Sequence, residues 1–482
     1  MSQPFGRREF LQATITGSAL CMAGGCIRPK GPGSRMKPLV STGCRRSKVR
    51  VGKLYLGQQG GHWPTPKLDL KAEIQRYEAQ FARMKPQLTD VDFVGNQLVS
   101  SPEQVRALSD TLQGVDGILA IHLSMRAGET LNEILSLGRP TMFFAAPYSG
   151  HEWSRLGTRL QEESGTRLDC VLTSDYDELA VAVRPFRAIH HLREAKIIDV
   201  TMRQPSEEFV KSVREKFGTE IKVIGREPVL DAYNAISMDD ARAEADRWIR
   251  QAERVMEPSK DEILRSCRLA LAFERILDAG DATVITVDCY GSMYHQLPAF
   301  PCIGFTRLNN MGLGGICESD LQSALTHILF QGLAGKPGFI SDPTVDESNN
   351  SIILAHCLGT TKMDGPAGKA APYRLRSIME RQEGAVPQVR MRIGQKVTQA
   401  RFVGTDLVVC FTGEIIGIPD TDRGCRTKIA VKVDGEVGQL WRNWAHGLHR
   451  VTCYGDLTKD LRRFCRFKGV RMVNEALESS SA

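Results

Sequence analysis

The chain has 482 residues, a formal charge of +7 at pH 7, 42% hydrophobic residues and 25% charged residues. This length exceeds what one compact core uses and indicates about two to four domains. Lysine and arginine are spread along the chain without a basic block interleaved with aromatics. We therefore expect no nucleic-acid partner.

The N-terminus has the layout of an export signal. Arg7 and Arg8 precede Phe10 and Leu11, and a short apolar run, "ATITGSALCMAGG", follows. A charged region before a short apolar one is typical of secretory signals, and paired arginines resemble a twin-arginine signal. The apolar run is too short to span a bilayer stably. We predict a twin-arginine-type signal over 1–26 and export to the periplasm; a chance basic helix is the alternative.

The stretch after this signal reads as a linker. Residues 27–48 are rich in proline, glycine and basic residues, and Cys26 bears a weak likeness to a lipoprotein cleavage site. The chain has thirteen cysteines, scattered and without CxxC spacing. This pattern predicts neither a disulfide framework nor a zinc site, and most cysteines read as small buried apolar residues.

Two α/β units follow the linker. Over 49–190, apolar runs such as "VRVGKLYLG", "GVDGILAIH" and "RPTMFFAAP" alternate with amphipathic stretches. Over 191–355, "AKIIDV", "TEIKVIG", "DATVITVD" and "NSIILAHC" are the strand candidates, again with helical patterns between them. Short apolar strands alternating with helices predict two doubly wound, Rossmann-like parallel sheets.

The pattern changes in the last part of the chain, 356–482. From about 385, "QVRMRIG", "KVTQARFVG", "DLVVCFTGEIIG" and "TKIAVKVDG" alternate with period two and are joined by glycine-rich turns. This predicts an antiparallel β domain, a small barrel or sandwich, before a final helix and strand. The predicted fold class is α/β: two doubly wound domains followed by a C-terminal antiparallel β domain.

Three polar residues stand where strands of the second unit are expected to end. Glu318 follows the run "NNMGLGGIC", Asp342 lies in "GFISDP", and His356 ends "SIILAH". Ligands bind at the carboxyl ends of parallel strands, so the three side chains are candidates for one site. Each has a plainer explanation: a helix-start acid for Glu318, a turn cap for Asp342, a core histidine for His356.

Two further histidines precede the strand-like run "RVTCYGD" near the C-terminus. His446 and His449 are separated by a glycine, so we expect one of them to point inward. Two carboxylates with a histidine form a mixed oxygen and nitrogen ligand set. Such a set suits manganese or a similar divalent ion better than a metal that prefers thiolates.

Three more residues are weaker candidates for contacts with a sugar. Lys362 lies in "TTKMDGP", where a solvated turn is the plainer interpretation. His62 and Trp63 lie in the first glycine-rich loop and have the chemistry to bond to or stack on a sugar.

A set of ordered motifs resembles a known family. The segments "CESD", "GFISDP", "AHCLGTTKMDGP", "APYRLRSIMERQEG", "TGEIIG", "CRTKIAVKV" and "HRVTCYGD" together resemble the L-fucose isomerase-like branch of the fucose/arabinose isomerase superfamily. The resemblance is strongest over about 280–475. It implies two α/β domains and a C-terminal β domain, in agreement with the pattern along the chain.

The resemblance also implies a function and a ligand set. Members of the family bind a divalent metal, usually manganese, and Glu318, Asp342 and His449 match their ligands, with His446 as the rival of His449. His356 matches a stretch in which a histidine is a ligand, so it is a further metal or substrate contact. The implied reaction is aldose–ketose isomerisation of a pentose or deoxyhexose through an ene-diolate, with Glu318 and Asp342 passing protons. The family also implies a homo-oligomer with sites near subunit interfaces.

One feature departs from the family pattern. Fucose isomerases are cytoplasmic by habit, whereas this chain carries an export-type N-terminus. The departure leaves two alternatives open. One is an exported carbohydrate-binding protein that kept the scaffold without turnover, and the other is a sugar epimerase.

Overall fold

The computed structural model describes residues 47–59, 63–151, 153–161 and 167–477. The predicted signal, Cys26 and His62 lie outside the described residues, so these predictions stay untested. Among the described helices, none combines the length and the apolar character needed to cross a bilayer.

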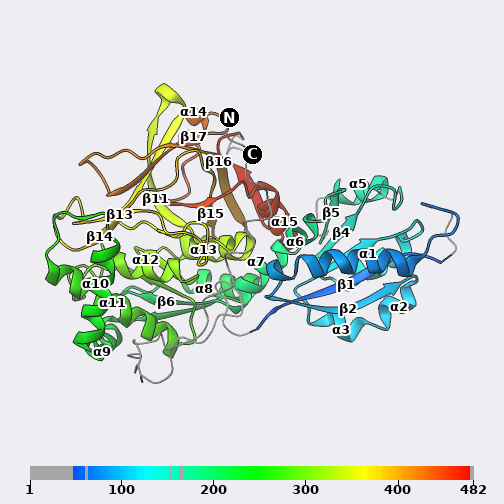
Figure 1. Cartoon of the computed structure of the whole chain (residues 1–482), viewed down its shortest axis with the longest axis horizontal. Helices are drawn as coiled ribbons and strands as arrows, with labels where there is room; N and C mark the ends of the chain where they lie inside the picture. Colours follow the sequence, from blue (N-terminus) through cyan, green and yellow to red (C-terminus); the bar gives the residue numbers. More distant parts are fainter. Residues whose placement is uncertain (1–46, 60–62, 152, 162–166, 478–482) are drawn as a thin grey trace, which may run out of the picture. The chain divides into compact units, whose positions relative to one another are not determined.

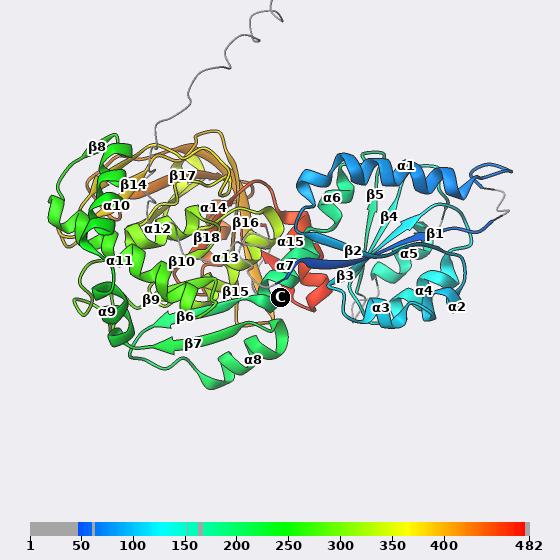
Figure 2. The same cartoon turned by 60° about the horizontal axis from the view of Figure 1, so that its bottom comes forward.

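The first α/β unit is built on a five-stranded parallel sheet in the order β2-β1-β3-β4-β5. Helix α1 packs on one face through Leu70, Tyr77 and Phe81, while α2, α3 and α4 cover the other face. Figure 2 shows these helices on opposite sides of the strands. The doubly wound arrangement is therefore confirmed. Its elements are β1 (Val49–Leu56), α1 (Leu70–Arg83), η1 (Lys85–Gln87), β2 (Val91–Val99), α2 (Pro102–Arg106), α3 (Ser109–Gln113), β3 (Gly117–His122), α4 (Gly128–Ser136), β4 (Thr141–Ala145), α5 (Trp153–Gln161), β5 (Leu168–Leu172), α6 (Glu178–Ala182) and α7 (Arg184–Glu194).

The second α/β unit has a four-stranded parallel sheet in the order β10-β9-β6-β7. Three of the four predicted strands, "AKIIDV", "TEIKVIG" and "DATVITVD", form part of it. Its elements are β6 (Lys196–Val200), α8 (Glu207–Phe217), β7 (Glu220–Ile224), α9 (Arg226–Asn234), α10 (Met238–Gln251), α11 (Lys260–Ala279), β9 (Val284–Val287), α12 (Cys302–Asn310), β10 (Gly314–Cys317) and α13 (Leu321–Ala334).

The remaining strands form a closed antiparallel barrel. Its order is β15-β18-β11-β12-β17-β16, and pairing of β16 with β15 closes it, while β19 adds to β16 in parallel. This confirms the predicted C-terminal antiparallel β domain. The elements are β11 (Phe339–Asp346), η2 (Glu347–Asn349), β12 (Ser351–His356), β15 (Lys396–Val403), β16 (Leu407–Gly417), β17 (Thr427–Val433), α14 (Val437–Arg442), β18 (Arg450–Tyr454), α15 (Thr458–Lys468) and β19 (Arg471–Asn474), and a small separate sheet contains β14 (Val386–Val389), β13 (Tyr373–Arg376) and β8 (Arg254–Val255).

The prediction that "NSIILAHC" belongs to the central parallel sheet is wrong. That segment is β12, which pairs antiparallel with β11 and β17 inside the barrel. The physical reason is the length of the connection between β11 and β12, which is the short turn η2. A parallel crossover takes about a dozen residues or more, so these two strands form a hairpin. The barrel thus begins before the predicted boundary at 355.

Helix α13 lies in the core shared by the second sheet and the barrel (Figure 1). Its residues Ala324 and Ile328 share one buried cluster with Ile316 of β10 and with Val451 of β18. The helix is buried on all sides from Ser323 to Leu333. The N-terminal end of α13 is thereby held between the parallel sheet and the barrel, and this end carries the candidate site.

Candidate active site

Glu318 lies in a strained turn between β10 and α13. Its φ is +63° and that of Ser319 is +52°, a region that residues other than glycine rarely adopt. The turn is fixed because the Ser319 N–H donates to Val287 O at 3.1 Å and the Ser319 hydroxyl donates to Asp199. Backbone strain held in place by its surroundings is common at functional sites.

The barrel brings the other predicted residues beside Asp342. On β11, Asp342 stands opposite Ala355 of β12, and Ser341 stands opposite Arg450 of β18. His356 and His449 therefore approach Asp342 from two neighbouring strands. Asp342 and His356 thus lie in antiparallel strands, not at the ends of parallel ones as expected, whereas Glu318 does follow the parallel strand β10.

Four side chains from distant parts of the sequence meet there. His449 Nε2 lies 3.2 Å from Asp342 Oδ1 and 3.6 Å from Glu318 Oε2. His356 Nε2 lies 3.8 Å from Glu318 Oε1, and the two imidazole rings are 5.5 Å apart between centroids. The convergence that the sequence argument requires is present in the structure.

Asp320 contacts the candidate site, and the sequence analysis missed it. It caps α13 by accepting from the Ser323 N–H at 3.0 Å. Its Oδ2 also accepts from Arg401 Nη1 at 2.6 Å and lies 2.9 Å from His449 Nδ1. A carboxylate on one imidazole nitrogen fixes the ring so that the other nitrogen can serve as a ligand. An aspartate before an apolar helical run signals a helix start, but nothing local reveals its distant histidine partner.

Burial and charge push the pKa values of the two carboxyls in opposite directions. Burial raises the pKa of Glu318, and the charge of His449 offsets this only in part. Burial also acts to raise the pKa of Asp342, but its contact with His449 and the charge of His356 outweigh it and lower the pKa. Paired carboxyls with divergent pKa values divide the roles of acid and permanent anion between them.

The pKa values of the two histidines also shift in opposite directions. Burial acts to lower the pKa of His449, but Asp320 and Asp342 outweigh it and raise the pKa to about 10. Burial lowers the pKa of His356 to about 4, and the charge of His449 adds to this. At neutral pH the protein without metal therefore holds a proton on His449 and a neutral His356.

The donors fit a divalent metal ion. Asp342 Oδ1, His356 Nε2 and His449 Nε2 are buried, and among the described residues none of these atoms makes a well-aligned hydrogen bond, although His449 Nε2 and Asp342 Oδ1 face each other at 3.2 Å. The three donors lie within 4.8 Å of one another, and Glu318 stands beside both histidines. Buried polar atoms without a partner are costly, and a bound cation would satisfy all of them. Oxygen and imidazole donors together suit manganese and similar ions.

Two known sugar isomerases are similar to this chain. The chain is 22% identical to a sulfoquinovose isomerase of Alkalicoccus urumqiensis over 426 residues, covering 78% of this chain and 90% of that protein. It is 24% identical to a sulfoquinovose isomerase of Clostridium sp. (strain MSTE9) over 145 residues, covering 29% of this chain and 32% of that protein. Both of these similar proteins are sugar isomerases by name. No family model matches the chain.

Other predicted contacts lie apart from the donor cluster. His446 is half-buried and is not among the grouped donors of the described residues, so the geometry favours His449. The Lys362 ammonium donates to Pro366 O at 2.7 Å within its own turn. Trp63 lies against His151 with 4.4 Å between ring centroids, in a pocket of the first α/β unit. The roles proposed for these residues stay predictions.

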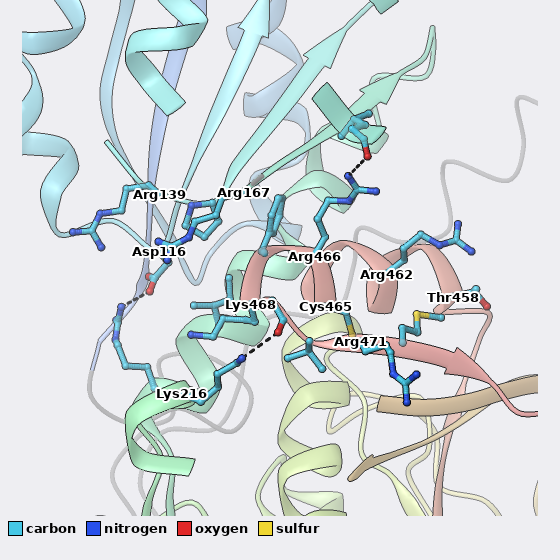
Figure 3. A pocket seen from close by; sticks show the side chains of 18 of the residues that line it. Asp116, Arg139, Arg167, Lys216, Thr458, Arg462, Cys465, Arg466, Lys468 and Arg471 are labelled. Carbon is cyan, nitrogen blue, oxygen red and sulfur yellow. Dashed lines mark hydrogen bonds and ion pairs between the residues drawn. The ribbon is translucent and has the colours of Figure 1, made fainter. Parts of the chain in front are cut away.

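A second feature is a basic cavity of about 1320 Å³ (Figure 3). None of the predicted site residues lines it. Its acidic lining residues are Asp116 and Glu215, whereas its eight basic ones are Arg139, Arg167, Arg193, Lys216, Arg462, Arg466, Lys468 and Arg471. Burial and the charges of Lys216, Arg167 and Arg193 lower the pKa of Lys468 to about 8. The cavity therefore carries an excess of positive charge.

Proposed function

We propose that the protein is a metal-dependent aldose–ketose isomerase. The metal would be held by Glu318, Asp342 and His449, with His356 as a further ligand or a contact to the sugar. The observation that carries the proposal is the set of buried donors without well-aligned hydrogen bonds. The similarity to sulfoquinovose isomerases over most of both chains supports the same reaction class.

The reaction moves a proton between C1 and C2 of the sugar while the carbonyl moves the other way. A bound divalent metal supplies stabilisation of the negative charge that develops on the two oxygens. The proton at carbon needs a positioned acid–base group, which typically contributes about a hundredfold to ten-thousandfold in rate.

We assign the proton transfer at carbon to Glu318. Burial raises its pKa, which makes it a better proton acceptor and donor than a carboxylate that stays ionised. Asp342 keeps its negative charge because its pKa is lowered, and it is suited to hold a cation. His449 is kept in one orientation by Asp320, and His356 stays neutral. The sequence left open which carboxylate is the base, and the divergent pKa values favour Glu318.

The substrate proposal narrows the predicted class of pentoses and deoxyhexoses. Sulfoquinovose is a hexose whose C6 carries a sulfonate in place of a hydroxyl, so it is itself a deoxyhexose. The names of both relatives make it the first sugar to test. Manganese is the first metal to test, because the donors are oxygen and imidazole.

The test uses purified protein, stripped with a chelator and then reloaded with manganese. Sulfoquinovose, pentoses and other deoxyhexoses are incubated in D₂O, and NMR follows ketose formation and deuterium at C1 and C2. We expect metal-dependent conversion of at least one sugar. Tight binding without conversion would support the carbohydrate-binding alternative, and a C2 epimer without ketose would support the epimerase.

The decisive variant is Glu318→Gln. It removes the acid–base group, so we expect kcat to fall by about a hundredfold to ten-thousandfold. Elemental analysis of the variant shows whether the loss reflects chemistry or metal content. Glu253→Gln is the matched control, because Glu253 is an exposed glutamate paired with Arg390. Equal loss in both variants would contradict the assignment.

Export and assembly remain proposals from the sequence alone. We propose that the protein reaches the periplasm by the twin-arginine route and assembles as a homo-oligomer. Cell fractionation with an Arg7→Lys, Arg8→Lys variant and light scattering of the purified protein would test these two points.

A further inference from the structure

A second group of potential metal donors lies next to the candidate active site. Cys357 directly follows His356 at the end of β12 and is buried. Cys425 precedes β17 and is half-buried, and Glu380 lies between β13 and β14. The sequence analysis interpreted most cysteines as small buried apolar residues, because their spacing shows no metal-binding motif.

The distances from Cys425 to the other two side chains are those of a tetrahedral ion site. Cys357 Sγ and Cys425 Sγ lie 3.6 Å apart, and Cys425 Sγ lies 3.5 Å from a carboxylate oxygen of Glu380. Zinc sites have Zn–S distances of about 2.3 Å and Zn–O distances of about 2.0–2.2 Å. Tetrahedral geometry then places two sulfurs about 3.8 Å apart and a sulfur and an oxygen about 3.5 Å apart.

The carboxylate is the observation that points to an ion. Two thiols at 3.6 Å are also in ordinary contact, and a disulfide would need an S–S distance of about 2.05 Å. Glu380, however, is an exposed residue whose carboxylate lies against the Cys425 thiol. All three donors lie within 4.8 Å of one another. A cation shared by the three groups accounts for this arrangement.

We propose that Cys357, Glu380 and Cys425 bind a thiolate-preferring divalent ion, zinc in the first place. The two thiols lose their protons to solvent when the ion binds, and the fourth position is left for water. Tyr290 has its hydroxyl 3.9 Å from Cys357 Sγ and supports that ligand from outside. Soft thiolates select zinc over manganese, so this site and the oxygen and imidazole site prefer different metals.

The consequence is local order beside the candidate active site. The ion would tie the end of β12 to the β13–β14 connection and to the segment before β17. His356 is the neighbour of one ligand, so its backbone would be held by the same ion. The proposal does not depend on isomerase activity, because its measurements report metal and thiolate alone.

The test is titration of the full chain with Co²⁺ and Zn²⁺ after chelator treatment. We expect thiolate-to-cobalt charge-transfer absorption in the near ultraviolet that zinc abolishes and manganese does not. Cys425→Ser should lose this absorption and bind zinc at least tenfold more weakly, with a smaller effect from Glu380→Gln. Cys170→Ser is the matched control, because Cys170 is a half-buried cysteine of β5.

Any one of three results would overturn the proposal. The first is the absence of thiolate absorption in the unmodified protein, and the second is equal absorption in Cys425→Ser. The third is a chain mass lower by two hydrogens, which would show a disulfide. Cys425 is the residue to change first, because Cys357 is buried and its loss could unfold the barrel. Glu318→Gln should keep the absorption. Its loss there would mean one shared ion instead of two sites, whereas absent isomerase activity with intact absorption would contradict only the proposed function.

Discussion

His449 carries the strongest electrostatic perturbation in the candidate active site. It faces Asp320 on one ring nitrogen and Asp342 on the other, so two carboxylates raise its pKa to about 10. A metal ion that binds Nε2 must displace the proton held there. Protonation of one imidazole thus sets how the site responds to pH.

Metal affinity should therefore rise with pH. Below the His449 pKa of about 10, one proton leaves for each metal bound, so the affinity for Mn²⁺ should increase by about tenfold per pH unit between pH 6 and 8. In the metal-free protein, by contrast, the contribution of His449 to the free energy of unfolding should fall as pH rises. The raised pKa stabilises the folded state below the unfolded pKa of about 6.5, and this is lost as pH rises toward 10. Calorimetric titration with Mn²⁺ and urea unfolding measure the two effects.

The variant Asp320→Asn tests whether His449 holds the proton that the metal ion displaces. It removes the carboxylate that contributes most to the raised pKa of His449. The pH dependence of Mn²⁺ affinity should flatten above pH 7. Asp434→Asn is the control, because Asp434 is a surface partner of Lys396. An unchanged slope in Asp320→Asn would show that another group holds the proton.

At the scale of elements, helix α13 depends on close contact with α7. A Cβ placed on Gly332 of α13 would lie 2.4 Å from Ala188 Cα and 2.8 Å from Ala188 N on α7. Neither backbone atom can move without shifting a helix. The glycine is there because the two helices touch, and α13 in turn carries Asp320 at its first turn.

Gly332→Ala should destabilise the protein by about 1–3 kcal/mol, because overpacking outweighs the gain in helix propensity. Gly157→Ala in α5 is the matched control, since nothing lies within 4 Å of a Cβ built there. It should be neutral or stabilising by up to about 1 kcal/mol. Urea unfolding of both variants measures the difference, and equal changes would contradict the close helix contact.

At the scale of the whole molecule, the basic cavity gathers lysines and arginines from distant parts of the chain. Lys468 on α15 has its pKa lowered to about 8 by burial and by neighbouring cations. Its unfolded value is about 10.4, so the folded state binds fewer protons between these two values. The free energy of unfolding should therefore rise with pH across that window because of this group.

Lys468→Met should remove that rise and stabilise the protein at pH 7. The gain should be on the order of 1 kcal/mol, because solvent screens a half-buried cation. Lys459→Met on the same helix is the control, since Lys459 is exposed. Urea unfolding at pH 7, 8, 9 and 10 measures both. A persistent rise with pH in Lys468→Met would assign it to another group.

Local pattern was enough for most of the architecture. Apolar runs bounded by glycine and proline predicted the two parallel sheets, and period-two alternation predicted the barrel. Both patterns can be recognised in short stretches of sequence, because side chains alternate between the two faces of a strand and recur every three to four residues on one face of a helix. The same local pattern named Glu318 and Asp342 as polar residues at the ends of apolar runs. It left His446 and His449 as alternatives, and only the family resemblance favoured His449.

Only the tertiary structure decided how these residues meet. Asp342 belongs to a hairpin in the barrel, and it lies beside His449 through pairing of β11 with β18, strands about a hundred residues apart. Asp320, Glu380 and Cys425 become partners of distant side chains through the same packing. Strand register and helix packing depend on many contacts between residues far apart in the sequence, so they cannot be predicted from any single segment.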